Sequence, residues 1–145
     1  MAAKKAYVQA GITDPLKQLD FLEIYDSYTM AEAQAYEDLG LCACGQAGTF
    51  IDKGYAFMPD IDYGLALPDQ GKFPVNPSGG LLACGHPIGA TGIMQAVFSL
   101  WQLQHTIADK FGDDTLQIKH AKRGGFHSHA GTGTYITLTL AEKAW

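Results

Sequence analysis

Hydrophobic and polar positions in the first third of the chain predict two helices around a short strand. Strong helix formers fill residues 2–10 and stop at Gly11, which predicts a helix that ends there. The apolar run FLEIY at residues 21–25 predicts a short buried strand. Residues 27–41 predict a second helix, with Gly40 as its stop signal.

Polar residues predict how that second helix begins. Ser27 or Thr29 suits the N-cap position, because a hydroxyl oxygen can accept a hydrogen bond from a free backbone N–H. Glu32 follows Thr29 by three residues, the spacing of a capping box. We therefore expect Thr29 and Glu32 to bind each other's backbone N–H groups.

The remaining pattern predicts a long loop, one long helix and two strands, an order that indicates an α/β fold. Residues 42–74 are rich in glycine and proline with weak periodicity, so we expect a functional or interfacial loop excursion. A helix is predicted over 88–105, and strands over 116–123 and 134–140 enclose a glycine-rich loop at 124–133. This helix is expected to be buried, with an apolar face that comprises Ile93, Met94, Val97, Leu100 and Trp101.

Composition narrows the class of protein. The 145 residues suffice for one domain, and 47% of them are hydrophobic, which indicates a globular chain with a core. A net charge of −5 argues against a nucleic-acid partner, because phosphates require a basic surface. No apolar stretch is long enough to span a bilayer. Three cysteines, an odd number, favour reduced thiols and a cytoplasmic location.

Candidate chemistry is densest in NPSGGLLACGHPIGATG, residues 76–92, where glycines surround His86. The predicted helix begins within this motif, so His86 lies near free N–H groups and the positive end of the helix dipole. That position favours a neutral imidazole that donates a hydrogen bond. A phosphate-binding loop, a tight packing corner and a catalytic loop all fit these residues.

The same motif resembles the N-x-x-G-G to G-H-P-x-G-A-x-G signature of the thiolase superfamily, whose members make or break carbon–carbon bonds beside acyl-CoA thioesters. FLEIYDSYTMAEAQAYEDLGLC resembles a segment of sterol-carrier-protein-type and archaeal thiolases, and HAGTGTYITLTL resembles their terminal loop and strand. The resemblance covers nearly all of residues 1–145 and corresponds to the C-terminal part of such a subunit.

The resemblance implies a partial thiolase-like half-domain, in which a mixed sheet carries flanking helices. We expect a partner chain with the N-terminal thiolase half to complete it. The start at Met1 and the ending after LAEKAW favour a natural small subunit over a fragment. Small zinc-ribbon/OB-fold proteins often pair with such relatives and are a further expected partner.

Residue roles follow from the resemblance. His86 matches the histidine that donates to the thioester carbonyl oxygen, and Gly131 matches a glycine whose N–H helps form a second oxyanion site. The glycines are expected to line the tunnel for the pantetheine arm, while Asn76 and Ser78 stabilise the loop. The expected substrate- and CoA-binding set is Asn76, Ser78, Gly79, Gly80, Gly85, Gly89 and Ala90.

Three positions depart from the conventional thiolase pattern. Tyr25 and Ser27 replace the histidine and cysteine of the His-Asp-Cys-Phe motif, and His129 replaces the terminal acid/base cysteine. The acylated nucleophile belongs to the missing N-terminal half. The cysteines that do not match it are Cys42, Cys44 and Cys84.

These departures favour aldol over Claisen chemistry. Tyrosine has an ordinary pKa of about 10, so it removes protons poorly at neutral pH, but it can act as a tuned acid/base. We expect a thiolase-like aldolase that cleaves a β-hydroxyacyl-CoA, as in steroid side-chain degradation, or related thiolase chemistry. Tyr25, His129 and Tyr135 are candidate bases, although Tyr25 also fits a buried strand aromatic. The alternative is a non-catalytic acyl-CoA-binding or scaffolding subunit.

Neither a metal nor a covalently bound cofactor is expected, and coenzyme A enters as part of the substrate. His127, His129 and the pair Cys42-x-Cys44 offer metal-ligating side chains. However, C-x-C is not the usual C-x-x-C spacing of a zinc knuckle.

Overall fold

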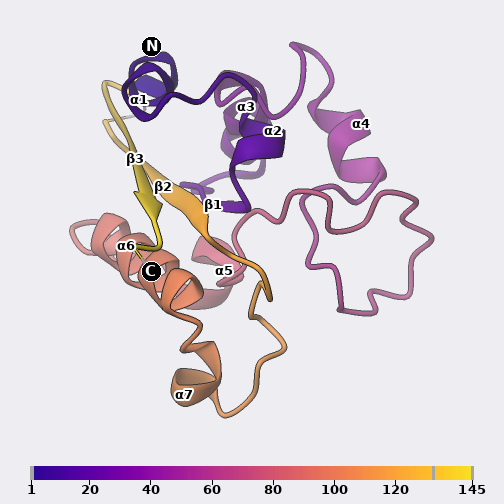
Figure 1. Cartoon of the computed structure of the whole chain (residues 1–145). Helices are drawn as coiled ribbons and strands as arrows, with labels where there is room; N and C mark the ends of the chain where they lie inside the picture. The colour runs from indigo at the N-terminus through magenta and orange to yellow at the C-terminus, as the bar shows by residue number, and fades with distance from the viewer. Residues whose placement is uncertain (1, 132, 145) are drawn as a thin grey trace.

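A three-stranded mixed sheet forms the centre of the fold (Figure 1). The computed structural model describes residues 2–131 and 133–144. Met1, the expected subunit start, and Thr132, in the predicted loop over 124–133, lie outside the described residues, as does Trp145. The strand order is β1-β2-β3, with β1 parallel and β3 antiparallel to β2. The strands are β1 (Phe21–Glu23), β2 (Arg123–Ala130) and β3 (Tyr135–Glu142).

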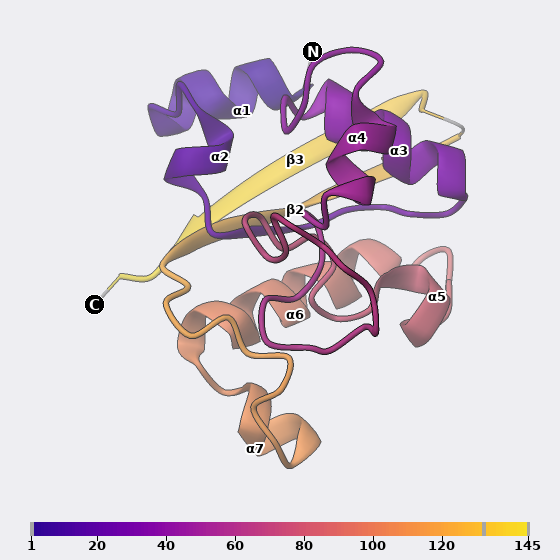
Figure 2. The same ribbon diagram turned by 90° about the vertical axis from the view of Figure 1, so that its right-hand side faces the viewer.

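Helices cover both faces of this sheet. Figure 2 shows α1 (Ala2–Ala10) and α3 (Thr29–Asp38) above it and α6 (Thr91–Gln104) below it. Helix α1 packs against β3, whereas α6 packs mainly against β2. The shorter helices are α2 (Pro15–Gln18), α4 (Ala47–Asp52), α5 (Gly80–Cys84) and α7 (Ile107–Phe111). The main core contains Leu22, Ile24, Tyr36, Leu41, Phe50, Phe73 and Val75.

The first helices largely follow the sequence pattern. The helix predicted over 2–10 is confirmed at both ends. Helix α3 begins at Thr29 and ends before Gly40, which has a φ of 71°. The predicted capping box is wrong: within the described ranges no side-chain hydrogen bond caps α3, and Glu32 Oε1 instead accepts a hydrogen bond from Tyr36 Oη at 2.5 Å.

The strand predicted over 116–123 is wrong, because this segment is almost entirely a loop and β2 occupies most of the glycine-rich stretch over 124–133. A Cβ on Gly124 would overlap the ring of Phe21, and one on Gly125 would overlap the β3 backbone. Glycine in a strand often marks such a close approach. These glycines therefore reflect tight sheet packing rather than a turn.

The apolar face predicted for α6 is also wrong. Gln95, Ser99 and Gln102 face the sheet and are each 1% exposed, whereas Ile93 is 68% and Leu100 49% exposed. Ser99 Oγ donates to a carbonyl of β2, and the Gln102 amide binds backbone groups of the loop before β2. Hydrogen bonds offset the cost of burying Ser99 and Gln102, whereas the Gln95 amide has no hydrogen-bond partner among the described residues. An apolar side of α6 consequently points outward.

The excursion over 42–74 contains helix α4 and is closed by its own contacts. Gln70 Nε2 donates to the carbonyl oxygens of Met58 and Ile61, at 2.8 and 2.7 Å. Directly after the excursion, Val75 forms a parallel bridge with Leu22 of β1. The segment thereby delivers the glycine-histidine motif to the sheet. None of the helices in the described ranges is long and apolar enough to cross a membrane.

Candidate active site

His86 lies in the exposed connection between α5 and α6, and both of its ring nitrogens have partners. Its Nε2 lies 2.8 Å from Tyr25 Oη, and its Nδ1 lies 2.8 Å from Thr91 Oγ1. The rings of His86 and Tyr25 meet edge to face, with centroids 5.1 Å apart. The imidazole is therefore held in one orientation by residues from two different elements.

Tyr25 lies two residues after the end of β1 and is only 7% exposed. Its backbone N–H donates to Nδ1 of His127 at 3.4 Å, across the β1–β2 pairing. Burial raises the pKa of the Tyr25 phenol, and the nearby Tyr28 raises it further. The phenol therefore stays protonated at neutral pH and can donate a hydrogen bond.

A second histidine packs on the same phenol. The His129 ring centroid lies 4.2 Å from that of Tyr25, and His129 Nδ1 is buried without a hydrogen-bond partner among the residues that the structure describes. Burial lowers the pKa of His129, and His86 lowers it further. Burial also lowers the pKa of His127 to about 4, with His129 as the smaller cause. His127 and His129 are therefore neutral at pH 7.

Two acidic side chains bind the residues on either side of Gly79 and Gly80, the glycine pair that precedes His86. Glu23, fully buried on β1, accepts hydrogen bonds from the backbone N–H and the hydroxyl of Ser78, at 3.0 and 2.6 Å. Asp26 accepts the backbone N–H of Leu81 at the start of α5. Gly80 is required beside it, because a Cβ there would overlap the Asp26 carboxylate and φ is +65°.

Asn76 begins the motif as a structural link to β1. Its Oδ1 accepts the Ile24 N–H at 2.6 Å, and its own N–H donates to Leu22 O at 2.8 Å. Asn76 is one of two non-glycine residues with positive φ among the described residues, at 50°. These bonds tie the turn before Gly79 to the strand that carries Tyr25.

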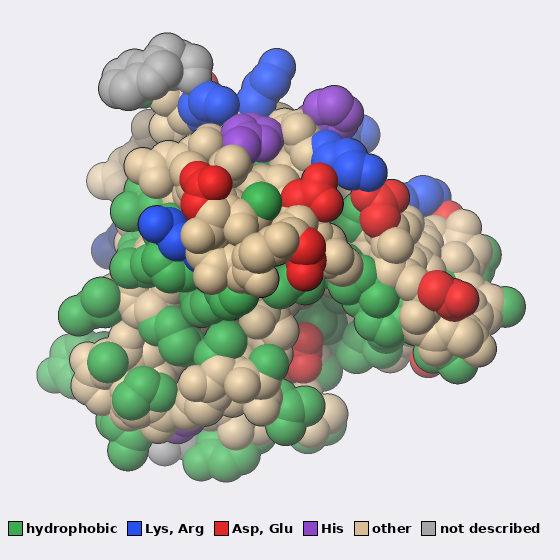
Figure 3. All heavy atoms as spheres, turned by 90° about the horizontal axis from the view of Figure 1, so that it is seen from below, with side chains coloured by type: hydrophobic (Ala, Val, Ile, Leu, Met, Phe, Trp, Pro, Cys, Tyr) green, Lys and Arg blue, Asp and Glu red, His purple; other side chains and the backbone are tan. Residues whose placement is uncertain are grey.

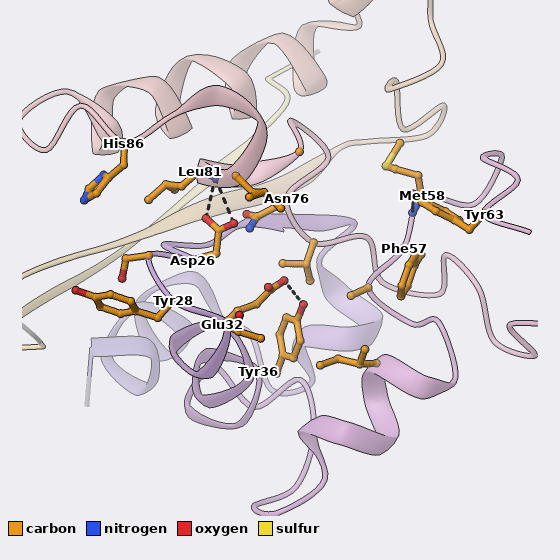
Figure 4. A pocket seen from close by; sticks show the side chains of 17 residues that line it. Asp26, Tyr28, Glu32, Tyr36, Phe57, Met58, Tyr63, Asn76, Leu81 and His86 are labelled. Atoms are coloured by element: carbon orange, nitrogen blue, oxygen red, sulfur yellow. Dashed lines mark hydrogen bonds between the residues drawn. The ribbon is translucent and has the colours of Figure 1, made fainter. Parts of the chain in front are cut away.

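An open cavity of about 800 Å³ begins at His86 and reaches the excursion (Figure 4). Tyr28, Leu81 and Asp26 lie near its His86 end, and the ring of Phe57 lies near the other end. Burial raises the pKa of Glu32, which points to Tyr36 inside the cavity. The cavity can hold a ligand with one apolar end and an end that faces the imidazole.

The structure brings together some predicted site residues and separates others. Tyr25, His86 and His129 form one cluster. Gly131 lies at the end of β2 in the turn closed by Thr134, and its φ is 59°. Tyr135 is 74% exposed and pairs with Ala130, so it faces the side of the sheet opposite to His129. The exposed positions of the expected CoA-binding set are Gly79, Gly85, Gly89 and Ala90.

Four residues that hold the site were not predicted to do so from the sequence. Thr91 contacts His86, His127 contacts the Tyr25 backbone, and Glu23 and Asp26 bind the motif. Two signals were available: carboxylates next to a buried apolar run, and a threonine at the helix start five residues after the histidine.

Cys84 is the last residue of α5 and lies within the glycine-histidine motif. Burial raises the pKa of the Cys84 thiol, as do the charges of Glu23 and Asp26, so it is not an activated nucleophile. Within residues 2–131 and 133–144, no group of three His, Cys, Asp or Glu side chains is arranged to hold a metal ion.

Comparisons with known proteins place the chain in one family. A family model described as thiolase C-terminal domain-like matches residues 1–142. Sterol carrier protein 2 of Homo sapiens is 42% identical over 139 residues, which are 96% of this chain and 22% of that protein. The acetyl-CoA acetyltransferase of Methanocaldococcus jannaschii is 42% identical over 144 residues, which are 99% of this chain and 33% of that protein.

A solved structure, the Ltp2-ChsH2(DUF35) aldolase, has the same fold, with a TM-score of 0.71 and 21% sequence identity. The match covers 99% of this chain and 31% of the solved chain. The chain thus spans only about a fifth to a third of the length of these relatives. With its three-stranded mixed sheet and flanking helices, it belongs to the thiolase C-terminal domain-like family.

Proposed function

We propose that the chain is part of a thiolase-like enzyme that cleaves a β-hydroxyacyl-CoA by a retro-aldol reaction. The observation that carries this proposal is the hydrogen bond between Tyr25 Oη and His86 Nε2, at 2.8 Å, beside the cavity. A phenol with a raised pKa is a poor base alone, but an imidazole in contact with it can take its proton. Tyr25 and His86 together therefore provide a base for a substrate hydroxyl.

In this reaction the substrate β-hydroxyl loses its proton, the bond between Cα and Cβ breaks, and a carbonyl product leaves. The bond electrons pass to Cα and form the enolate of the shortened thioester. We assign stabilisation of the enolate oxygen to His86 and a second oxyanion site to the Gly131 N–H, because such donors act most strongly where charge develops. We assign His129 the role of a further acid/base group, beside Tyr25.

The proposed enzyme needs more chain than these residues. Ile93 and Leu100 on α6 and Ile88 just before it are exposed, and hydrophobic side chains gather on the lower left of Figure 3, while charged ones lie mostly in its upper half. Large exposed apolar patches mark interaction sites. We assign this surface to the N-terminal thiolase half, in a partner chain or a longer protein, and keep a zinc-ribbon/OB-fold protein as a further partner.

The test uses the chain with the rest of its enzyme and measures carbonyl release from β-hydroxyacyl-CoA substrates. Tyr25→Phe and His86→Ala are each expected to lower kcat by roughly 10²–10⁴-fold. Tyr135→Phe, at an exposed position outside the cluster, serves as the control and keeps wild-type activity. Thiolysis of β-ketoacyl-CoA without aldol cleavage would overturn the proposal in favour of thiolase chemistry. Coenzyme A binding without either turnover would establish the non-catalytic alternative.

A further inference from the structure

The Thr91 hydroxyl connects His86 to the start of α6. Thr91 is fully buried, and its Oγ1 lies 2.8 Å from His86 Nδ1 and 3.2 Å from the carbonyl oxygen of Pro87. A hydroxyl has one proton, so it can donate to only one of these two neighbours. The direction of this bond decides which nitrogen of His86 carries the imidazole proton.

The Thr91 hydroxyl can donate either to Pro87 O or to His86 Nδ1, and the number of available protons distinguishes these two arrangements. If Thr91 donates to Pro87 O, Nδ1–H of His86 donates to Thr91, and the free lone pair on Nε2 accepts the Tyr25 hydroxyl. Each of the three contacts, from Tyr25 to His86, from His86 to Thr91 and from Thr91 to Pro87 O, is then a hydrogen bond with its own proton. If Thr91 instead donates to Nδ1, its 3.2 Å contact with Pro87 O has no proton, and the Tyr25 hydroxyl proton loses its partner.

We propose that Thr91 is a positioning residue that holds neutral His86 in the Nδ1–H tautomer, with Nε2 as the acceptor for Tyr25. This inference rests on the proposed function for its catalytic meaning. It changes the order of events there, because His86 begins the reaction as an acceptor and becomes a donor only afterwards.

The proton transfers balance in this order. The substrate β-hydroxyl gives its proton to Tyr25 Oη as Tyr25 gives its own proton to His86 Nε2. The bond between Cα and Cβ breaks, the β-oxygen forms a carbonyl group, and the electron pair passes to the thioester enolate. His86 is now a cation with protons on both nitrogens, which stabilises the enolate. Protonation of Cα through the same path regenerates neutral His86 and completes the cycle without an external oxidant or reductant.

The position of Thr91 is well suited to this role. It is the first residue of α6, and its backbone N–H and that of Ala90 also donate to Pro87 O, at 2.9 and 2.7 Å. Removal of the hydroxyl therefore leaves the Pro87 carbonyl satisfied and removes only the partner of Nδ1. Valine has nearly the shape of threonine, so Thr91→Val isolates this hydrogen bond.

The experiment measures ¹⁵N NMR shifts of the His86 ring in the complete enzyme, with His86→Gln used to assign the signals. The wild type is expected to show a protonated Nδ1 and an unprotonated Nε2. Thr91→Val should mix the two tautomers and lower kcat about tenfold or more, while KM changes little. Thr91→Ser retains the hydroxyl and should restore both the tautomer and kcat.

A protonated Nε2 in the neutral wild-type ring would overturn the inference, as would a Thr91→Val enzyme with unchanged tautomer and kcat. The NMR signal does not depend on turnover. An Nδ1–H tautomer in an enzyme that cleaves no β-hydroxyacyl-CoA would therefore refute the proposed function and support the tautomer assignment.

Discussion

Tyr25 and His86 lie 61 positions apart in the chain, yet Tyr25 Oη is 2.8 Å from His86 Nε2. The contact exists because β1 ends beside the connection between α5 and α6. Glu23 and Asp26, on the same segment as Tyr25, bind the residues that lead into that connection. One short segment therefore supplies both the phenol and the supports that hold the imidazole against it.

This contact predicts that Tyr25 and His86 act as a unit. The double variant Tyr25→Phe/His86→Ala should lose little more activity than either single variant, because residues that act together give non-additive effects. A double-mutant cycle on kcat/KM for a β-hydroxyacyl-CoA provides the measurement. Fully additive losses would mean that the two side chains act independently.

Gly80 should be far less tolerant of substitution than Gly85. A Cβ at Gly80 meets the Asp26 carboxylate, whereas a Cβ at Gly85 meets no described atom within 4 Å, and both residues have positive φ. Gly85, with φ 79° and ψ 171°, lies in a backbone region that is almost exclusive to glycine, so Gly85→Ala should cost about 1–3 kcal/mol of unfolding free energy from backbone strain alone. Gly80→Ala should cost more, and denaturant titration of both variants measures the difference. Equal costs would show that Asp26 moves away freely.

Glu23 should make stability fall as pH rises. Burial raises the pKa of its carboxyl to about 7, against the lowering effect of the Ser78 bonds. A raised folded pKa stabilises the fold below the ordinary value of 4.5, and this contribution is lost as pH rises through about 7. Relative to the wild type, Glu23→Gln should gain up to about 3 kcal/mol between pH 5 and pH 8.

Denaturant titrations of both proteins at the two pH values measure this gain. His127 has the opposite pH dependence, because its lowered pKa of about 4 adds stability as pH rises from about 4 to 6.5. That contribution is common to both proteins and cancels in the comparison. A difference independent of pH would contradict the assignment to Glu23.

The outward side of α6 should make the isolated 145-residue chain self-associate. Lysine at Ile93 or Leu100, which are 68% and 49% exposed, should reduce this association because it interrupts the apolar surface. Sedimentation velocity measures association, and circular dichroism should show unchanged helix content. Val8→Lys on α1 is the matched control, since Val8 is 74% exposed on the other side of the sheet. An equal effect at Val8 would argue against a specific α6 surface.

Local patterns were sufficient where a segment's own residues decide its structure. The helix over 2–10 and the strand that begins at Phe21 are examples, because helix formers and a buried apolar run act within a few residues. The pattern failed at β2, whose glycines suggested a loop. It failed again at α6, where hydrophobicity suggested that Ile93 is buried. In both cases the decisive contact comes from another element: Phe21 against Gly124, and the close approach of α6 to the sheet.

The sequence by itself determined the α/β class, the thiolase-like motif and the residue types at Tyr25, His86 and His129, because these are carried by composition and local order. Only the tertiary structure decided that these three side chains meet and that Tyr135 does not join them. It alone revealed Thr91 behind the imidazole. The physical reason is that hydrogen bonds and ring contacts depend on the pairing of β1 with β2 and on the position of α6, which residues distant in sequence set together.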